Sequence, residues 1–490
     1  MIEEIIEKAK KENKKVYIFA HKNPDGDAIG SSRALAEHLK LQGIEAKYVV
    51  TNEIKSYNTI MGNMPITTNI DSDSISIILD TSTVDYAENT LFNKSSLENT
   101  YVIDHHGKIN GKPCIEEELG LSSENVIRNP NASSVCEILV NELQPELVTP
   151  QIANMLSLGL LTDTAKLKFL KSNTLENLSK LIEMGADYEG LLKFCSRKSF
   201  LREEVGMAQA FLKTKKFQIG DTFGTMLFLD NSEVDNLNKT YGIRLPQKKI
   251  FKLSDIEDCS FNCIAAENNS GEYNCEFRST KILGNFNVLQ LATLYGGGGH
   301  YSASGCPIKT TNEHTKTNIE SQLEQQVVDM YSEQATNLEP IHHSEQDEEL
   351  ANIFTQTNHL SEQITPDILQ QINSLVKSGA NYEYTYKTFK TFEQFMLENE
   401  ILSRIPSEMY SQKFPKVLVN LSQKDIEILC QQYHVSEDEI LSSINTFSNI
   451  NIDSAMISLP NGRKSSIDKN GNISITPSME EKETLTDLHR

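Results

Sequence analysis

Apolar runs that stop at an aspartate or histidine recur four times within the first 165 residues, and this pattern constrains the fold more than any other feature. Three runs are short and rich in β-branched residues, which predicts buried strands, and the fourth has a helical pattern. Helical patterns lie between the runs. The alternation predicts an α/β fold with a parallel sheet, whose carboxyl edge is where such folds bind ligands. The runs are residues 16–20 before His21, 75–79 before Asp80, 101–103 before Asp104, and 156–161 before Thr162-Asp163.

The first segment, His21-Lys-Asn-Pro-Asp25-Gly-Asp27, places one imidazole and two carboxylates in a turn. Pro24 and Gly26 bend the chain, so the three side chains can point to one place. On this stretch alone, a solvated turn is an alternative. An EF-hand loop is not, because no glutamate follows at the required position and a strand precedes the turn.

Together the segments offer imidazoles and carboxylates and no thiolate. This donor set suits manganese, cobalt or magnesium better than a structural zinc ion. Without metal, four converging carboxylates would repel one another and raise each other's pKa values. Two divalent cations would neutralise them, and a two-metal site hydrolyses phosphoesters or phosphoanhydrides by activating a water molecule.

A second α/β lobe is predicted from strand patterns at residues 222–229, 261–267, 273–278 and 303–308. Four consecutive glycines, Gly296 to Gly299, precede His300 there. Glycine lets backbone N–H groups approach an anion closely, although such a run is more often a flexible loop. Arginine and backbone amides together could hold a phosphate or a nucleotide. The candidate substrate-binding residues are Arg278, Ser279, Gly297, Gly298, Gly299 and His300.

The composition limits the partners. The chain has 68 acidic and 46 basic residues and a formal charge of −22, which argues against duplex DNA or an anionic membrane as partner. No apolar stretch approaches the roughly 20 residues of a spanning helix. The N-terminus reads as an amphipathic helix and not as a signal peptide. Eight cysteines without C-x-x-C spacing predict free thiols, a reducing compartment and a cytoplasmic location.

The predicted organisation has five parts. A catalytic lobe spans residues 1–197, a linker helix 198–215, and the smaller α/β lobe 216–335, across a cleft from the first. An acidic linker follows at 336–365, and a mainly helical extension with a flexible tail spans 366–490. His342-His343, in the predicted linker, reads as surface, since a lone pair lacks the further ligands of a metal site.

These motifs resemble the DHH/DHHA1 phosphoesterase family, most closely its type with oligoribonuclease and adenosine 3′,5′-bisphosphate (pAp) phosphatase activity. The resemblance covers about residues 1–335. Its motifs, in family order, are His21-x-x-x-Asp25-x-Asp27, Asp80 after a strand, Asp104-His105-His106, Gly159-Leu-Leu-Thr-Asp163-Thr, and the glycine run before His300.

The resemblance implies a role for each residue. His21, Asp25 and Asp80 would bind one manganese, and Asp27, Asp80, His105 and Asp163 the other, with Asp80 bridging. His106 would contact the scissile phosphate, and Asp104 would orient this cluster. Arg278 and His300 would hold the substrate's terminal phosphate or sugar edge. Ala165 and Leu167 depart from the glycine and phenylalanine usual in the family, and Ser304 from the usual alanine.

The expected function is therefore manganese-dependent hydrolysis of short oligoribonucleotides to mononucleotides, removal of the 3′-phosphate of pAp, or both. A cyclic-dinucleotide phosphodiesterase is the alternative within the class, and a catalytically silent nucleotide-binding or scaffold protein is the alternative outside it. Mg²⁺ and Co²⁺ are alternative metals. Two questions are left open: whether the chain forms a homodimer, and whether the extension binds a protein partner.

Overall fold

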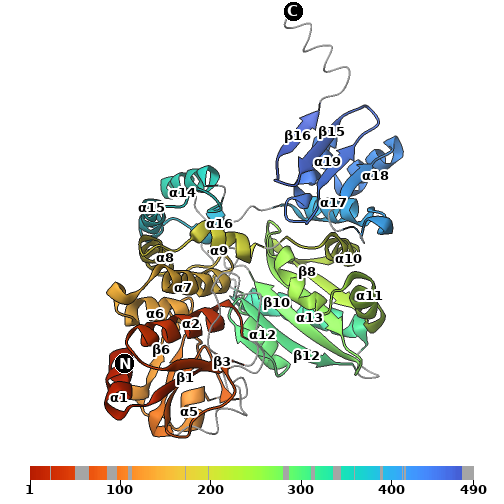
Figure 1. Cartoon of the computed structure of the whole chain (residues 1–490). Coiled ribbons are helices and arrows are strands. Elements are labelled where there is room, and N and C mark those ends of the chain that lie inside the picture. The colour runs from red at the N-terminus through yellow and green to blue at the C-terminus, as the bar shows by residue number, and fades with distance from the viewer. Residues whose placement is uncertain are drawn as a thin grey trace, which may run out of the picture. The chain divides into compact units, whose positions relative to one another are not determined.

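A computed structural model describes most of the chain and divides it into two compact units. Unit 1 comprises Met1–Ser196 with His342–Lys387, and unit 2 comprises Arg197–Ile341 with Thr388–Arg490. Figure 1 shows the elements in chain order. The described residues are 1–21, 24–49, 66–84, 97–108, 113–171, 173–196, 198–279, 286–310, 315–334, 344–357, 359–386, 390–410, 412 and 415–476.

The core of unit 1 is a parallel sheet with the strand order β3-β2-β1-β4-β5-β6. This is the doubly wound order, in which successive strands are added on one side of β1 up to β3 and on its other side from β4 onward, so that the switch point lies between β1 and β4. The predicted parallel sheet is confirmed. Its strands are β1 (Lys15–Phe19), β2 (Ala46–Val49), β3 (Ile66–Thr67), β4 (Ser74–Leu79), β5 (Thr100–Asp104) and β6 (Val126–Arg128).

Alternating residues of β1 pack on opposite faces of this sheet. Val16 and Ile18 join the large core with the helices, whereas Tyr17 and Phe19 join a smaller core that includes Ile115 of α5. Both faces are therefore apolar. The helices are α1 (Ile2–Glu12), α2 (Gly26–Leu41), α5 (Ile115–Leu119), α6 (Val135–Glu142), α7 (Pro150–Asp163), α8 (Thr174–Glu183) and α9 (Tyr188–Cys195).

Unit 2 contains a mixed sheet with the order β11-β12-β10-β9-β8-β7. Only the β8–β9 pair in this sheet is parallel. The strands are β7 (Lys215–Ile219), β8 (Thr222–Leu229), β9 (Cys259–Glu267), β10 (Glu272–Ser279), β11 (Gly298–His300) and β12 (Ala303–Lys309). The helices are α10 (Leu201–Phe211), α11 (Asn231–Tyr241), the 3₁₀ helix η6 (Pro246–Leu253), α12 (Val288–Leu294) and α13 (Lys316–Gln334).

The C-terminal extension is part of both units. The helices α14 (Glu345–Gln356), α15 (Pro366–Lys377) and α16 (Tyr382–Tyr386) belong to unit 1. Unit 2 contains α17 (Phe392–Ser403), α18 (Gln423–Tyr433), α19 (Glu437–Ser442) and η10 (Ser443–Phe447). It also contains a second sheet, β13-β14-β15-β16, which the sequence analysis did not predict. Its strands are β13 (Lys416–Asn420), β14 (Ser454–Ser458), β15 (Lys464–Asp468) and β16 (Ile473–Thr476).

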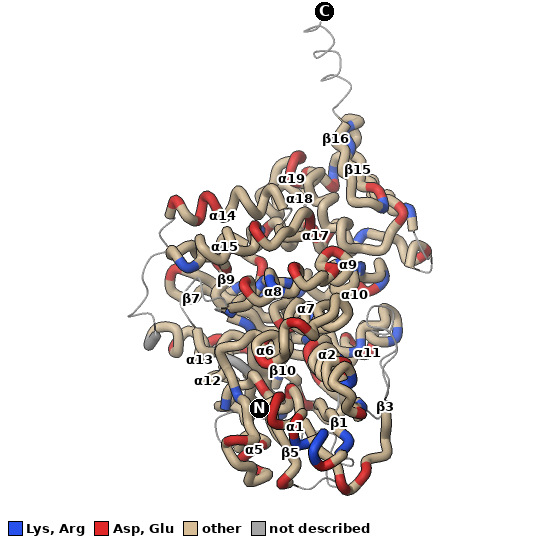
Figure 2. The backbone as a smooth tube through the Cα atoms, turned by 60° about the vertical axis from the view of Figure 1, so that its left-hand side comes forward, with Lys and Arg blue, Asp and Glu red and all other residues tan. Residues whose placement is uncertain are grey.

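Two segments predicted as linkers differ in the structure. Residues 345–356 form α14 despite their acidic sequence, because Ser344 and Asp347 make a capping box and Leu350 and Phe354 enter the core. Figure 2 shows the acidic residues along α14. In the predicted linker helix, α10 buries Val205 and Phe211 in the core of unit 2. His342-His343 and the predicted tail beyond residue 476 lie outside the described residues.

All eight cysteines are free, as predicted. Across the described ranges, no helix combines the length and the apolar character needed to cross a membrane.

Candidate metal centre

The site begins where β1 and β4 end, at the switch point of the parallel sheet. His21 lies two residues after the end of β1, and its Nε2 lies 3.6 Å from Oδ2 of Asp80, the residue after β4. Asp80 has a backbone φ of 50°, in the left-handed region that costs a non-glycine residue free energy. The chain therefore accepts strain where it turns the Asp80 carboxylate toward the site.

Asp25 lies just before α2, and Asp27 lies in its first turn. Asp25 is the N-cap, and its Oδ1 accepts hydrogen bonds from the N–H groups of Asp27 and Ala28 at 3.0 and 3.2 Å. The same oxygen lies 3.9 Å from Nε2 of His21. A Cβ at Gly26 would fall 2.4 Å from Thr162 of α7. The glycine is thus required by close helix packing, and its backbone does not need a positive φ.

Asp27 is fully buried at the N-terminus of α6. Its carboxylate oxygens accept hydrogen bonds from Val135 N–H at 2.7 Å and Cys136 N–H at 2.8 Å. These amides and the helix dipole favour the charged form. Burial and the charge of Asp80 nevertheless outweigh them and raise the pKa of Asp27 to about 7.

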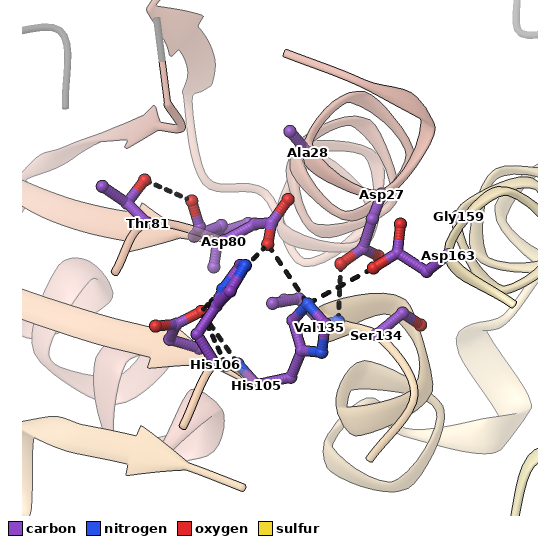
Figure 3. A network of polar contacts seen from close by, with 12 residues as sticks. Asp27, Ala28, Asp80, Thr81, His105, His106, Ser134, Val135, Gly159 and Asp163 are labelled. Carbon is purple, nitrogen blue, oxygen red and sulfur yellow. Dashed lines mark hydrogen bonds and ion pairs between the residues drawn. The ribbon is translucent and has the colours of Figure 1, made fainter. Parts of the chain in front are cut away.

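His105 connects Asp80 to the carboxylate of Asp163 at the end of α7. Its Nε2 lies 3.5 Å from Asp80 Oδ1 and 3.3 Å from Asp163 Oδ2. Figure 3 shows the imidazole between these carboxylates, with Asp27 beside Asp163. Gly159, one turn before Asp163, leaves room for Asp27, because a Cβ there would meet Asp27 Oδ1 at 2.7 Å. Burial and the negative charges of the other aspartates raise the pKa of Asp163 well above its usual value.

Asp104 holds His106 in place. Its Oδ1 accepts from the backbone N–H of His105 at 2.9 Å and lies 2.8 Å from Nδ1 of His106. Arg128 donates to Asp104 Oδ2 at 2.5 Å and to the His106 carbonyl at 2.8 Å, and is itself held by Glu116. Burial raises the pKa of Asp104, but His106 and Arg128 outweigh burial and lower it overall.

Arg128 is the residue of this site that the sequence analysis missed. It stands at the end of β6, where the backbone of Arg128 pairs with that of Asp104. The signal was indirect: a fully buried aspartate requires a charged or hydrogen-bonding partner, and Arg128 ends the next strand.

The candidate ligand atoms form overlapping groups within 4.8 Å of one another. One group contains His21, Asp25 and Asp80, another contains Asp27, His105 and Asp163, and a third joins Asp80, His105 and His106. All six predicted ligands are therefore brought together. Oδ1 of Asp80 is buried and accepts no hydrogen bond among the described residues. A buried carboxylate oxygen that accepts no hydrogen bond and lies among three other carboxylates fits a cation site.

The protonation of the metal-free site predicts how metal binding depends on pH. Burial alone would lower the pKa values of His21 and His105, but the facing carboxylates outweigh burial and raise both to about 9. Below pH 9 these rings carry a proton that a metal must displace. We expect Mn²⁺ affinity to rise from pH 6 to pH 9 with proton release, measurable by titration calorimetry in buffers of different ionisation enthalpy. Affinity that is flat over this range would contradict the assignment of these two ligands.

The predicted substrate-binding residues lie in unit 2. Gly298, Gly299 and His300 form β11, which pairs with β12, so this part of the glycine run is a strand and not a flexible loop. Ala303 of β12 pairs with His300 on one side and with Arg278 on the other, so these two positions are level across the sheet. The half-buried Arg278 donates to the Phe277 carbonyl at 2.8 Å, and Ser279 N–H donates to the Ser302 carbonyl at 3.0 Å.

Comparison with known families matches residues 15–160 to the DHH family, N-terminal domain. The match includes five of the six candidate ligands, and Asp163 follows three residues beyond it. The chain carries a DHH domain. The bifunctional oligoribonuclease and PAP phosphatase NrnA of Mycoplasma genitalium is 27% identical over 330 residues, which cover 64% of this chain and 94% of that protein. The protein of the same name from Mycoplasma pneumoniae is 23% identical over 318 residues, which cover 61% of this chain and 89% of that protein.

A third relative of this DHH chain is the cyclic-di-AMP phosphodiesterase PdeA of Listeria monocytogenes, 24% identical over 60% of this chain and 45% of that protein. Among solved structures, an exopolyphosphatase-related protein from Bacteroides fragilis has the same fold, with a TM-score of 0.53 and 20% identity over 67% of this chain and 98% of that one. The DHH domain and these relatives identify the chain as a metal-dependent phosphoesterase.

One departure from the family pattern, Ala165, lies in the turn after Asp163. Ala165, Lys166 and Leu167 have φ values of 51°, 63° and 68°, so three successive residues are left-handed. Glycine adopts this conformation without the clash that a Cβ causes. The glycine usual at position 165 therefore suits the turn better than Ala165 does.

We expect Ala165→Gly to stabilise the DHH unit by about 0.5–1 kcal/mol, because relief of strain exceeds the added entropy of the unfolded chain. Thermal unfolding would show a midpoint higher by roughly 1–4 °C. Ala153→Gly, inside α7, is the matched control and should lower the midpoint. If Ala165→Gly also lowered the unfolding midpoint, the backbone strain argued for Ala165 would be contradicted.

Proposed function

We propose that this chain is a manganese-dependent phosphoesterase that releases mononucleotides from short oligoribonucleotides and removes the 3′-phosphate of pAp. The observation that carries the proposal is the position of Asp80, whose two carboxylate oxygens face different ligand groups: Oδ2 faces His21, and Oδ1 faces His105. A carboxylate in this position suits a bridge between two metal ions. The substrates are those in the names of the two Mycoplasma relatives.

His21, Asp25 and Asp80 would hold one Mn²⁺, and Asp27, Asp80, His105 and Asp163 the other. Mg²⁺ and Co²⁺ also suit oxygen and imidazole donors. When bound, such a pair supplies an activated water and positive charge at the phosphoryl oxygens. The described geometry supports this division, because the first three residues and the set Asp27, His105 and Asp163 form separate groups.

The remaining residues would orient and bind. Nδ1 of His106 faces Asp104 and would donate its proton there. Nε2, on the other side of the ring, is therefore the atom that would contact a phosphate oxygen. Arg128 keeps Asp104 ionised and fixed, and so acts on His106 through it. Arg278 and His300 would hold the far end of the substrate, which restricts the enzyme to short substrates.

A cyclic-dinucleotide phosphodiesterase is the second candidate, and the similarity to PdeA favours it. The same metal centre would attack the phosphodiester in both cases, so the two candidates differ only in substrate.

The test is a substrate panel. Full-length protein with Mn²⁺ is incubated separately with di- to pentaribonucleotides, pAp, cyclic di-AMP and pyrophosphate, and the products are resolved by chromatography. We expect nucleoside monophosphates from the oligoribonucleotides and AMP from pAp. Hydrolysis of cyclic di-AMP alone would select the second candidate, and no hydrolysis of any substrate would contradict both.

A further inference from the structure

The helices α14–α16 of the extension repeat α7–α9 of the DHH unit. Each set is a helix, a turn with left-handed residues, a second helix, a glycine and a short third helix. The sequences Thr162-Asp163-Thr164 and Thr355-Gln356-Thr357 end the first helices. Gly-Ala-Asp187-Tyr188-Glu and Gly-Ala-Asn381-Tyr382-Glu begin the third. The shared order of elements and residues indicates a duplicated segment.

Several hydrogen bonds of the two sets correspond. Thr164 Oγ1 donates to the Leu160 carbonyl at 2.7 Å, and Thr357 Oγ1 to the Ile353 carbonyl at 2.8 Å. Before the third helices, Asp187 N–H donates to Asn154 and Asn381 N–H donates to Asp347, at 2.7 and 2.6 Å. Lys166 and Leu167 have φ values of 63° and 68°, and His359 and Leu360 have values of 50° and 60°. Chance similarity of helices does not reproduce such details.

The repeat continues in unit 2, where α17, β13, α18, β14 and β15 follow the order of α10, β8, α11, β9 and β10. Between these elements the first set also has β7 and η6, and the second also has α19 and η10. β8–β9 and β13–β14 are parallel, and β9–β10 and β14–β15 are antiparallel. α11 and α18 both begin with a capping box and end at a left-handed residue, Gly242 or His434. The second copy thus spans about residues 344–468, matching about 150–279.

The two copies contact each other reciprocally. In unit 1, α8 packs against α15. Tyr188 Oη donates to the Leu360 carbonyl at 2.8 Å, while Tyr382 Oη donates to the Leu167 carbonyl at 2.9 Å. In unit 2, the backbone of Ser199 forms an isolated parallel β-bridge with Ile450, and the backbone of Lys390 forms one with Ile256. Reciprocal contact between equivalent residues is the signature of a two-fold subunit interface.

From this reciprocity we infer that residues 344–468 are a second copy of residues 150–279 that takes the place of a second subunit and positions Asp163 through the bond from Tyr382 to Leu167. The copy has Gln356 where the first has Asp163, so that ligand is absent from it. Its Tyr382 Oη and Tyr386 Oη both donate to the left-handed turn directly after Asp163, at the carbonyls of Leu167 and Lys166. The positioning part rests on the proposed metal site.

Two substitutions in the full-length chain test the positioning. Tyr382→Phe and Tyr188→Phe each remove one hydroxyl from a buried tyrosine that donates to the carbonyl of an equivalent leucine. Only the Leu167 turn adjoins a candidate ligand. Both variants should lose similar thermal stability. Mn²⁺ affinity, measured by titration calorimetry without substrate, should fall roughly three- to tenfold in Tyr382→Phe and stay within about twofold in Tyr188→Phe.

Equal Mn²⁺ affinities in the two variants would overturn the positioning role. Sedimentation of the wild type over a concentration series tests the other half of the inference, independently of any metal. We expect a monomer of 55.1 kDa throughout. A stable dimer would overturn the claim that the copy replaces a second subunit. Absence of Mn²⁺ binding in the wild type would overturn the proposed function and the positioning role, with the sedimentation result unaffected.

Discussion

Asp80→Asn is expected to abolish hydrolysis and to remove at least one of two bound metal ions. The substitution removes the negative charge of a 3% exposed carboxylate whose two oxygens face both ligand groups. An amide has one oxygen acceptor, so it cannot bridge two cations. We expect activity to fall by on the order of 10³-fold or more, since neither ion would keep its position. Elemental analysis and product assays measure the two effects.

Asp71→Asn is the matched control for this prediction. Asp71 lies just before β4, the strand that Asp80 follows. Its side chain is exposed, and its Oδ2 lies 3.0 Å from Nζ of Lys15. Loss of an exposed ion pair costs about 0–1 kcal/mol and does not touch the site. The control should therefore retain its metal and its activity. An Asp80→Asn protein that keeps two equivalents of metal would show that Asp80 is no bridge.

Phe354→Ala is expected to have the largest effect on stability. Phe354 of α14 is 1% exposed, and its ring centroid lies 5.4 Å from that of Tyr382 and 5.3 Å from that of Tyr386. Truncation of a buried phenylalanine costs about 3–5 kcal/mol through lost burial and the cavity left behind. Because these tyrosines hold the Leu167 turn, Mn²⁺ affinity should fall together with stability.

Denaturant unfolding of the full-length chain measures the stability loss, with Phe200→Ala as control. Phe200 is 65% exposed, so its truncation should change the unfolding free energy by no more than about 0.5 kcal/mol. An independent extension would behave differently: Phe354→Ala would then leave the unfolding of unit 1 and the Mn²⁺ affinity unchanged.

The cluster of candidate ligands could be predicted from the sequence because each of these residues belongs to a short local pattern. An apolar strand followed by Asp80 or by Asp104-His105-His106 places these side chains at one edge of a parallel sheet. Arg128 was missed because its partner, Asp104, lies 24 positions earlier, and only the β5–β6 pairing brings them together. Local patterns carry no information on such pairing.

The role of the extension could not be predicted from composition or periodicity. Its acidic start resembles a solvated linker, and only the tertiary fold buries Phe354 and Tyr382. The signal was nevertheless present, since Gly-Ala-Asp187-Tyr188-Glu recurs as Gly-Ala-Asn381-Tyr382-Glu. The glycine run shows the same limit of local patterns: pairing with β12, which such a pattern does not specify, makes residues 298–300 a strand.

Anomalous diffraction from crystals grown with Mn²⁺ tests the two-metal centre most directly. The account predicts two peaks roughly 3.5–4 Å apart on either side of Asp80, one beside His21 and the other beside His105. A single peak, or two peaks that do not share Asp80, would contradict it.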